Sequence, residues 1–166
     1  MLSKSDLLSA ILKECHICVH LFDKIPDGKM DYRPTPKQRS TFELLQYLTY
    51  CASGFTDALI TGNWDGYGKF ETEAASMTAD QFPVAMEHEM QRISRLFESI
   101  SDNDFSTKEV ETMSGEKMKL GQGLLEITYR FISSYRMQLF LYAKASGNEN
   151  IWTPDCWEGV DVERKR

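Results

Sequence analysis

Apolar residues recur every three to four positions through most of the chain, which is the spacing of amphipathic helices. Four segments keep this pattern over several turns, at about 3–24, 40–62, 78–100 and 120–145. Each segment has one apolar and one polar face, and four such helices bury their apolar faces against one another. The pattern therefore predicts an all-α protein built as a four-helix bundle.

Short signals mark several ends of these predicted helices. Ser40 and Glu43 have the spacing of a capping box at the start of the second helix, and Gly62 follows its last apolar position. Pro83 suits the first turn of the third helix, and Gly147 follows the fourth. We therefore expect the second helix to run without interruption up to Gly62.

The segments between the helices differ in composition. Residues 62–77 are rich in glycine and aromatic residues and predict a long crossover without regular structure. Residues 105–119 alternate polar and apolar positions and predict either a loop or a small hairpin. The tail at 152–157 is aromatic enough to pack back, whereas residues from about 160 onward are expected to be frayed. The chain, 1–166, fits one domain.

Charge and composition argue against several classes of function. Lysine and arginine number 19 against 25 aspartates and glutamates, a net charge of −6, which argues against nucleic-acid binding. The longest stretch without a charged side chain, 44–56, is too short to span a bilayer, and residues 1–13 lack a signal-peptide pattern. The 4 cysteines are then expected to be reduced thiols. We expect a cytoplasmic protein with no membrane and no nucleic-acid partner.

Two segments resemble a known family. Residues 21–48, LFDKIPDGKMDYRPTPKQRSTFELLQYL, and residues 135–147, YRMQLFLYAKASG, are similar to the entry and closing segments of DinB-like proteins, also called YfiT-like. The resemblance implies the four-helix bundle of that family, with a long crossover between the second and third helices, and a homodimer. It also implies metal-dependent chemistry of the thiol-transferase or hydrolase type.

The metal-ligand positions of that family carry different residues in this chain. In the family, one histidine of the second helix and two histidines four residues apart on the fourth hold a divalent metal. The resemblance places these positions at Tyr47, Phe131 and Tyr135, although Arg136 of the closing motif remains. Phenylalanine has no ligand atom, and a neutral phenol with a pKa of about 10 is a poor ligand for zinc-like ions. We therefore expect no metal and no other cofactor.

Histidines elsewhere offer a fallback for a rebuilt metal site. His16 and His20 have the i, i+4 spacing of zinc ligands, but the helical rotation places them at the edge and on the far side of the apolar face. His88 lies between Glu87 and Glu89 and points away from the apolar face of its helix. A surface role is the simpler interpretation. If nickel, zinc or manganese is bound, His16 and His20 are the first ligands to consider.

Cys15 and Cys18 form a CxxC motif in the middle of the first predicted helix. Redox-active motifs of this kind open a helix, where the first thiol is ionised. Because both cysteines lie on the apolar face here, we expect them to pack in the core as small hydrophobic residues.

Several side chains are expected to meet where the family holds its metal. The predicted set is Tyr47, Phe131, Tyr135, Thr128, Glu89 and Arg136, with Arg136 or Glu43 at the rim. Two interpretations stay open. The buried hydroxyl groups bond one another as a structural plug in place of the metal, or they line a small-molecule pocket with aromatic walls.

These features support two main hypotheses about function. In the first, the protein is a metal-free cytoplasmic homodimer that binds a small ligand or has no enzymatic activity. In the second, it is an enzyme, with either a metal-free site that uses Tyr47, Tyr135 and Arg136 or a rebuilt metal site.

A third hypothesis is a protein-interaction module. Phe42, Tyr50 and Ile60 lie opposite the core face of the second predicted helix. An apolar surface of this kind can pair with a second copy of the chain.

Overall fold

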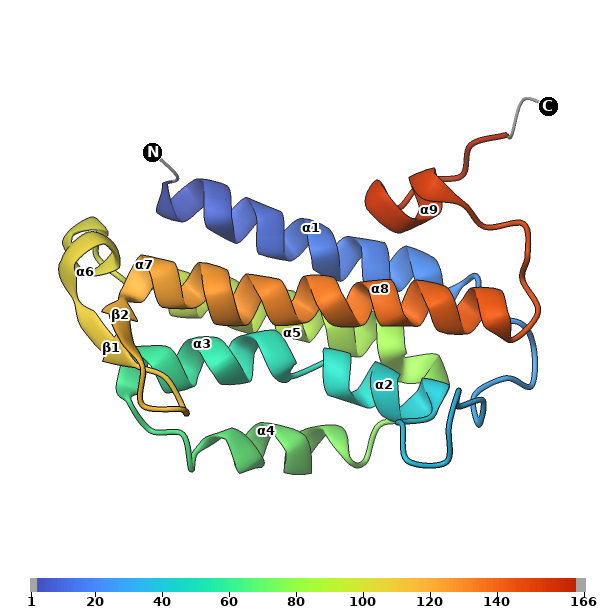
Figure 1. Ribbon diagram of the computed structural model, residues 1–166, viewed down its shortest axis with the longest axis horizontal. Helices are drawn as coiled ribbons and strands as arrows, with labels where there is room; N and C mark the ends of the chain where they lie inside the picture. The colour runs from blue at the N-terminus through green and yellow to red at the C-terminus, as the bar shows by residue number, and fades with distance from the viewer. Residues whose placement is uncertain (1–2, 164–166) are drawn as a thin grey trace.

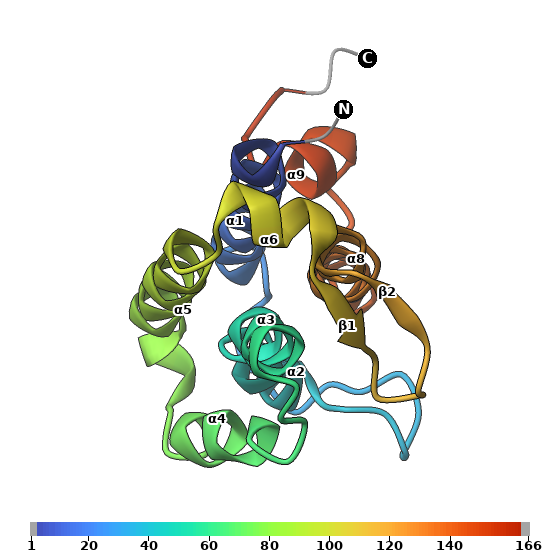
Figure 2. The same cartoon turned by 90° about the vertical axis from the view of Figure 1, so that its left-hand side faces the viewer.

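The computed structural model describes residues 3–163 and consists mainly of helices (Figure 1). The main elements are α1 (Lys4–Phe22), α2 (Thr41–Leu48), α3 (Cys51–Thr61), α5 (Phe82–Glu98) and α8 (Arg130–Ala145). Helix α1 packs against α5 and α8, and α3 packs against α5. Seen along the bundle, these helices surround a shared apolar core (Figure 2). The predicted all-α bundle is confirmed.

The first helix follows directly from its sequence. Ser3 caps it, because its hydroxyl accepts the N–H of Asp6 while the Asp6 carboxylate accepts the N–H of Ser3. The apolar face buries Ile11, Cys15 and Cys18 completely. All 4 cysteines of the chain are free and buried, and burial raises the pKa of Cys18. The CxxC motif is therefore a pair of packed, protonated thiols, as expected.

The second predicted helix is broken, which corrects the sequence analysis. Thr49 and Tyr50 separate α2 from α3, and Tyr50 has a φ of −144°, far from helical values. The hydroxyl of Thr49 donates to the carbonyl of Gln46 at 2.7 Å, and Arg92 of α5 donates to the carbonyl of Thr49 at 2.8 Å. Arg92, a residue of α5, thus helps to stabilise the break between α2 and α3.

The predicted ends of this region are confirmed. Ser40 and Glu43 form both bonds of the capping box. Gly62 ends α3 with a φ of 73°, a left-handed conformation that favours glycine. Pro83 lies in the first turn of α5.

The crossover after α3 contains regular structure that the sequence analysis did not predict. Helix α4 (Tyr67–Ala74) and the 3-10 turn η1 (Ala79–Gln81) lead into α5. Helix α4 packs closely on α3 at Gly54, where an added Cβ would lie 2.7 Å from Cε2 of Tyr67. The crossover therefore forms a side layer against α2 and α3 (Figure 1).

The segment before the last long helix contains a hairpin, one of the two predicted alternatives. A short helix, α6 (Asp102–Thr107), precedes strands β1 (Glu109–Glu111) and β2 (Lys117–Lys119), which pair antiparallel with Val110 opposite Met118. These two side chains are buried and their neighbours along each strand are exposed. The hairpin thus packs one face on the bundle.

The fourth predicted helix is one continuous rod with an irregular middle. Helix α7 (Leu120–Gly123) passes into a π-helical stretch, η2 (Leu124–Tyr129), and then into α8. Stretches of π-helix occur often at functional sites. Side chains of this rod line the candidate site.

The tail packs back onto the bundle, as predicted for 152–157. Helix α9 (Thr153–Trp157) contacts α1 and α8. Residues 160–163, expected to be frayed, form two hydrogen bonds with the rest of the chain. Lys24 donates to Asp161 at 2.5 Å, and the indole of Trp152 donates to the carbonyl of Val162 at 3.1 Å. The remaining positions of the expected frayed end, 164–166, lie outside the described residues. Among residues 3–163, no helix is long and apolar enough to cross a membrane.

Candidate functional site

The three positions that the resemblance identifies with metal ligands lie together in the fold. Tyr47 of α2 and Tyr135 of α8 have ring centroids 4.6 Å apart, and Phe131 lies one turn before Tyr135 at 6.2 Å. Sequence reasoning therefore placed these side chains correctly. They contact one another through their rings.

Three further aromatic side chains connect these three into a closed circuit of ring contacts. Phe55 lies 4.6 Å from Phe131 and 5.0 Å from Tyr67, and Tyr50 lies 5.6 Å from Tyr67 and 5.4 Å from Tyr47. We call the complete set the aromatic cluster; it consists of Tyr47, Tyr50, Phe55, Tyr67, Phe131 and Tyr135. Pairs of this kind stabilise a fold by about 0.5–1.5 kcal/mol each beyond area burial. The sequence analysis missed the additional three rings because they depend on the broken helix and on α4.

Burial holds three tyrosines of the aromatic cluster, Tyr47, Tyr50 and Tyr67, in the neutral form. Burial raises the pKa of Tyr50 to about 12 and raises those of Tyr47 and Tyr67 further above the ordinary range. The hydroxyl of Tyr67 is buried and has no hydrogen-bond partner within residues 3–163. Neutral phenols and a phenyl ring are not a donor set for a zinc-like ion. These side chains do not fit the metal of the DinB-like family.

Thr128 and Glu89, also predicted for this position, bond to α3 instead. The hydroxyl of Thr128 lies 3.2 Å from that of Thr56. The carboxylate of Glu89 accepts the N–H of Ser53 at 2.7 Å and its hydroxyl at 2.6 Å, and it pairs with Arg92 at 3.1 Å. Burial raises the pKa of Glu89 to about 7, although these hydrogen bonds oppose the rise. The two side chains fasten neighbouring helices to α3.

The side chain of Arg136 points toward α1 and α9 instead of the aromatic cluster, which corrects its placement among the site residues and as one of the two candidates, with Glu43, for the rim. It is only 2% exposed, and its Nε donates to Glu14 of α1 at 2.7 Å. Its Nη1 donates to the sulfur of Cys156 at 3.0 Å, and its guanidinium lies 5.0 Å from the ring centroid of Trp157. Arg136 therefore ties α8 to α1 and α9. Glu43 is held at the cap of α2.

The fold gives the two histidines of the fallback metal pair, which stay four residues apart on α1, different surroundings. His16 is exposed on α1, whereas His20, expected on the far side of the helix, is half-buried with Nε2 2.9 Å from a carboxylate oxygen of Asp155. His20, Asp155 and Asp161 each offer one ligand atom within 4.8 Å of the other two. The sequence analysis missed this grouping because it depends on the tail folding back onto α1. His88 is exposed, as expected.

The three residues of the predicted interaction surface differ in exposure. Tyr50 is only 5% exposed and belongs to the aromatic cluster. Phe42 and Ile60 are partly buried and pack against the core. The placement of Tyr50 opposite the core was wrong, because the break at Thr49 changes which residues face the core after α2.

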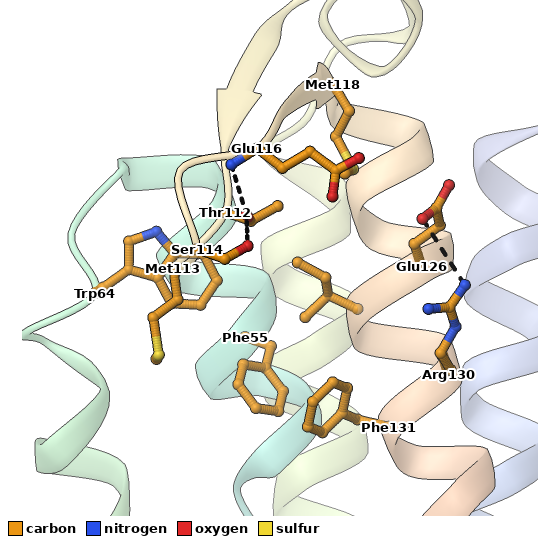
Figure 3. Close-up of a pocket in the computed structure, with 11 residues that line it drawn as sticks. Phe55, Trp64, Thr112, Met113, Ser114, Glu116, Met118, Glu126, Arg130 and Phe131 are labelled. Carbon is orange, nitrogen blue, oxygen red and sulfur yellow. Dashed lines mark hydrogen bonds and ion pairs between the residues drawn. The ribbon is translucent and has the colours of Figure 1, made fainter.

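An open pocket of about 500 Å³ lies between the aromatic cluster and the hairpin (Figure 3). Phe55 and Phe131 lie side by side at one end of the pocket, and Trp64 and Met113 stand together on one side. We call this the hairpin pocket. Its full lining is Phe55, Trp64, Thr112, Met113, Ser114, Glu116, Met118, Glu126, Ile127, Arg130 and Phe131.

Polar groups lie on the opposite side of the hairpin pocket. Glu126 and Arg130 of the rod form an ion pair at 3.8 Å, and the carboxylate of Glu116 lies across from them in the same view (Figure 3). The indole of Trp64 is fixed by donating to the carbonyl of Glu111 at 3.1 Å. Apolar walls with a few polar groups are the usual composition of a small-molecule site. This pocket was not predicted from the sequence because α3, the crossover, the hairpin and the rod, which are distant in sequence, all contribute to its lining.

Comparison with known proteins identifies the fold. The crystal structure of a DinB-like protein, YjoA, from Bacillus subtilis is similar, with a TM-score of 0.68 and 18% sequence identity over 89% of this chain and 95% of that one. No protein-family model and no curated protein matches the chain. The chain therefore has a DinB-like fold, as the segments at 21–48 and 135–147 indicated.

Proposed function

We propose that this protein binds a small molecule in the hairpin pocket without using a metal. The observation that carries the proposal is the aromatic cluster. It occupies the positions that the resemblance identifies with metal ligands, and two of its members, Phe55 and Phe131, also line the open pocket. The volume of about 500 Å³ suits a compact ligand of one or two rings.

The lining of the pocket supports a particular class of ligand. A flat apolar body contacts Phe55 and Phe131, while Arg130 and the hydroxyls of Thr112 and Ser114 bond to polar groups at its edge. The carboxylates of Glu116 and Glu126 favour a ligand that carries hydrogen-bond donors. We propose binding rather than catalysis, because the described lining contains carboxylates, hydroxyls and a guanidinium but no paired nucleophile and base.

We also propose a cytoplasmic location, which rests on the free, buried cysteines, and a homodimer, which rests on the resemblance to DinB-like proteins. Its interface lies outside the surface first considered, because Tyr50 is buried. Light scattering of the purified chain over a range of concentrations tests this part, and a monomer at all concentrations contradicts it.

The pocket is tested by screening small aromatic compounds for a rise in melting temperature and titrating those that bind. Met113→Ala is expected to weaken binding about fivefold, since a partial apolar contact contributes ~1 kcal/mol. Ser114→Trp is expected to abolish it by filling the pocket. Leu141→Ala is the matched control, because Leu141 and Met113 are both exposed apolar side chains and Leu141 lies outside the pocket. Unchanged affinity in Met113→Ala and Ser114→Trp contradicts the proposal.

The alternative is an enzyme with a rebuilt metal site, and the grouping of His20, Asp155 and Asp161 favours it. The hydrogen bond between His20 and Asp155 and the ion pair between Lys24 and Asp161 compete with an ion. Elemental analysis after exposure to nickel, zinc and manganese tests it. We expect no retained metal. Near-stoichiometric metal that is lost in His20→Ala and kept in His16→Ala supports the enzyme and contradicts the metal-free proposal.

A further inference from the structure

A second cavity, of about 440 Å³, lies at the opposite end of the aromatic cluster. Tyr47 and Tyr50 line it from α2 and the break, and α4 lines it from the side layer. The loop before α2 contributes Arg33, Lys37 and Arg39. We call it the basic cavity. It shares no lining residue with the hairpin pocket.

The charge of the basic cavity is opposite to that of the chain. The chain carries a net charge of −6, but Arg33, Lys37 and Arg39 face only two carboxylates here, those of Glu43 and Glu71. Local positive charge in a recess attracts anions more strongly than the same charge on an open surface.

Glu43 is already committed to partners within the protein. Its carboxylate accepts the N–H of Ser40 at 2.6 Å as part of the cap and pairs with Arg33 at 3.3 Å. The Ser40 bond, followed by Arg33, holds the pKa of Glu43 below its ordinary value. Within residues 3–163, Lys37 and Arg39 form no ion pair with any carboxylate. Their charges are available to a ligand.

Arg39 is positioned for such a ligand by aromatic contacts. Its guanidinium lies 4.1 Å from the ring centroid of Tyr47 and 5.7 Å from that of Tyr135. A guanidinium that lies over a ring keeps its N–H groups at the edge, where they pair bidentately with a planar oxyanion. The backbone at this position is fixed as well, because the carbonyl of Arg39 accepts the hydroxyl of Tyr142 at 3.0 Å.

We propose that the basic cavity binds a small organic oxyanion, a carboxylate or phosphate attached to an apolar body. Arg39 binds the oxyanion, Lys37 adds a second positive charge, and the apolar body packs against Tyr47, Tyr50 and Ala74. The site stands independently of the hairpin pocket and of any metal.

Titration calorimetry with benzoate and with phenyl phosphate, at low ionic strength, tests the proposal. We expect saturable binding of at least one probe, and the tighter of the two identifies the oxyanion. Arg39→Gln is expected to weaken binding at least tenfold, because a charge-assisted bidentate pair contributes more than a neutral hydrogen bond. Lys37→Gln is expected to weaken it about threefold, as removal of an exposed charge does.

Lys29→Gln is the matched control, because Lys29 is an exposed cation of the same loop that does not line the cavity. It is expected to leave binding unchanged, as is Ser114→Trp in the hairpin pocket. Arg39→Lys keeps the charge and loses the planar fork, so an intermediate affinity is expected. Absence of saturable binding of both probes overturns the proposal, as does an equal loss in Lys29→Gln and Lys37→Gln. A loss in Ser114→Trp would place the probes in the hairpin pocket instead.

Discussion

Helix α8 packs against a charged partner on one side and against uncharged aromatic rings on the other. Toward α1 and α9, Arg136 is almost completely buried and pairs its charge with Glu14. Toward α2 and α3, Phe131 and Tyr135 join uncharged rings, and cavities open at both ends of the aromatic cluster. A buried ion pair connects helices on the first side, whereas on the second side the buried rings are uncharged and the charged groups lie in the walls of the two cavities.

The ion pair that stabilises the fold and the candidate site therefore lie on different sides of α8. A buried ion pair and a bound metal both hold helices at fixed positions, and here an ion pair does so away from the candidate site. At the positions that the resemblance identifies with metal ligands, the side chains of this chain make aromatic contacts. Since function belongs to the site rather than to the fold, the shared DinB-like fold leaves this side free to differ.

The largest expected effect comes from removing one partner of the buried ion pair between Arg136 and Glu14. Arg136→Leu leaves the Glu14 carboxylate buried without its partner and is expected to lower the free energy of unfolding by about 3–5 kcal/mol. Urea denaturation measures the loss. The double variant Glu14→Leu/Arg136→Leu removes both charges and should recover most of the stability. A loss below about 1 kcal/mol in the single variant would mean that the ion pair is not structural.

A dependence of stability on pH is expected from Glu89, the buried carboxylate that bonds to Ser53 and Arg92. The folded-state pKa of Glu89, about 7, lies above the ordinary value of 4.5, so the folded state keeps a proton that the unfolded state loses. The resulting stability is fully present below pH ~4.5 and is lost as the pH rises through ~7, with a change on the order of 3 kcal/mol. Urea denaturation from pH 4 to 8 measures it. Glu89→Gln should remove this component, and parallel curves for both proteins would contradict it.

Introducing histidines into the aromatic cluster tests whether its side of α8 can bind a metal. The triple variant Tyr47→His/Phe131→His/Tyr135→His places three ligands where the resemblance locates the family metal. Zinc at 100 times its dissociation constant is then expected to stabilise the variant by about 2.7 kcal/mol. The rise in melting temperature on adding zinc measures this gain, with the unmodified chain as control. Equal responses of both proteins would mean that the three positions cannot converge on one ion.

The smallest expected effect concerns the close packing of α3 on α4. Gly54→Ala places a methyl group against the ring of Tyr67 and is expected to cost about 1–3 kcal/mol by overpacking, offset by ~1 kcal/mol of helix propensity. A net loss of about 1 kcal/mol in urea denaturation is expected. The double variant Gly54→Ala/Tyr67→Leu should recover it. A stabilised single variant would show that α4 shifts easily.

The sequence predicted the elements whose signals are local. Capping boxes, helical periodicity and the alternation near Val110 all act within a few residues. The break at Thr49 was missed because Arg92, from another helix, helps to hold it. With the break missed, the orientation of Tyr50 was also wrong.

The same reasoning applies to the candidate site. Tyr47 and Tyr135 were placed together through the resemblance, and their ring contact agrees. Arg136 was misplaced because its partner, Glu14, lies on the first helix, and helical rotation alone gives no information about which neighbour a polar side chain meets. The hairpin pocket was missed because its walls come from several segments distant in sequence.

The π-helical stretch at 124–129 has a consequence for counting positions along the last long rod. Bonding from residue i to i+5 takes up one more residue than an α-helical turn, so residues before and after the stretch are out of phase with a straight α-helix. An alignment with a relative whose rod is α-helical throughout therefore needs a one-residue gap here. Equivalent positions counted from Gly147 backward and from Lys119 forward will disagree by one.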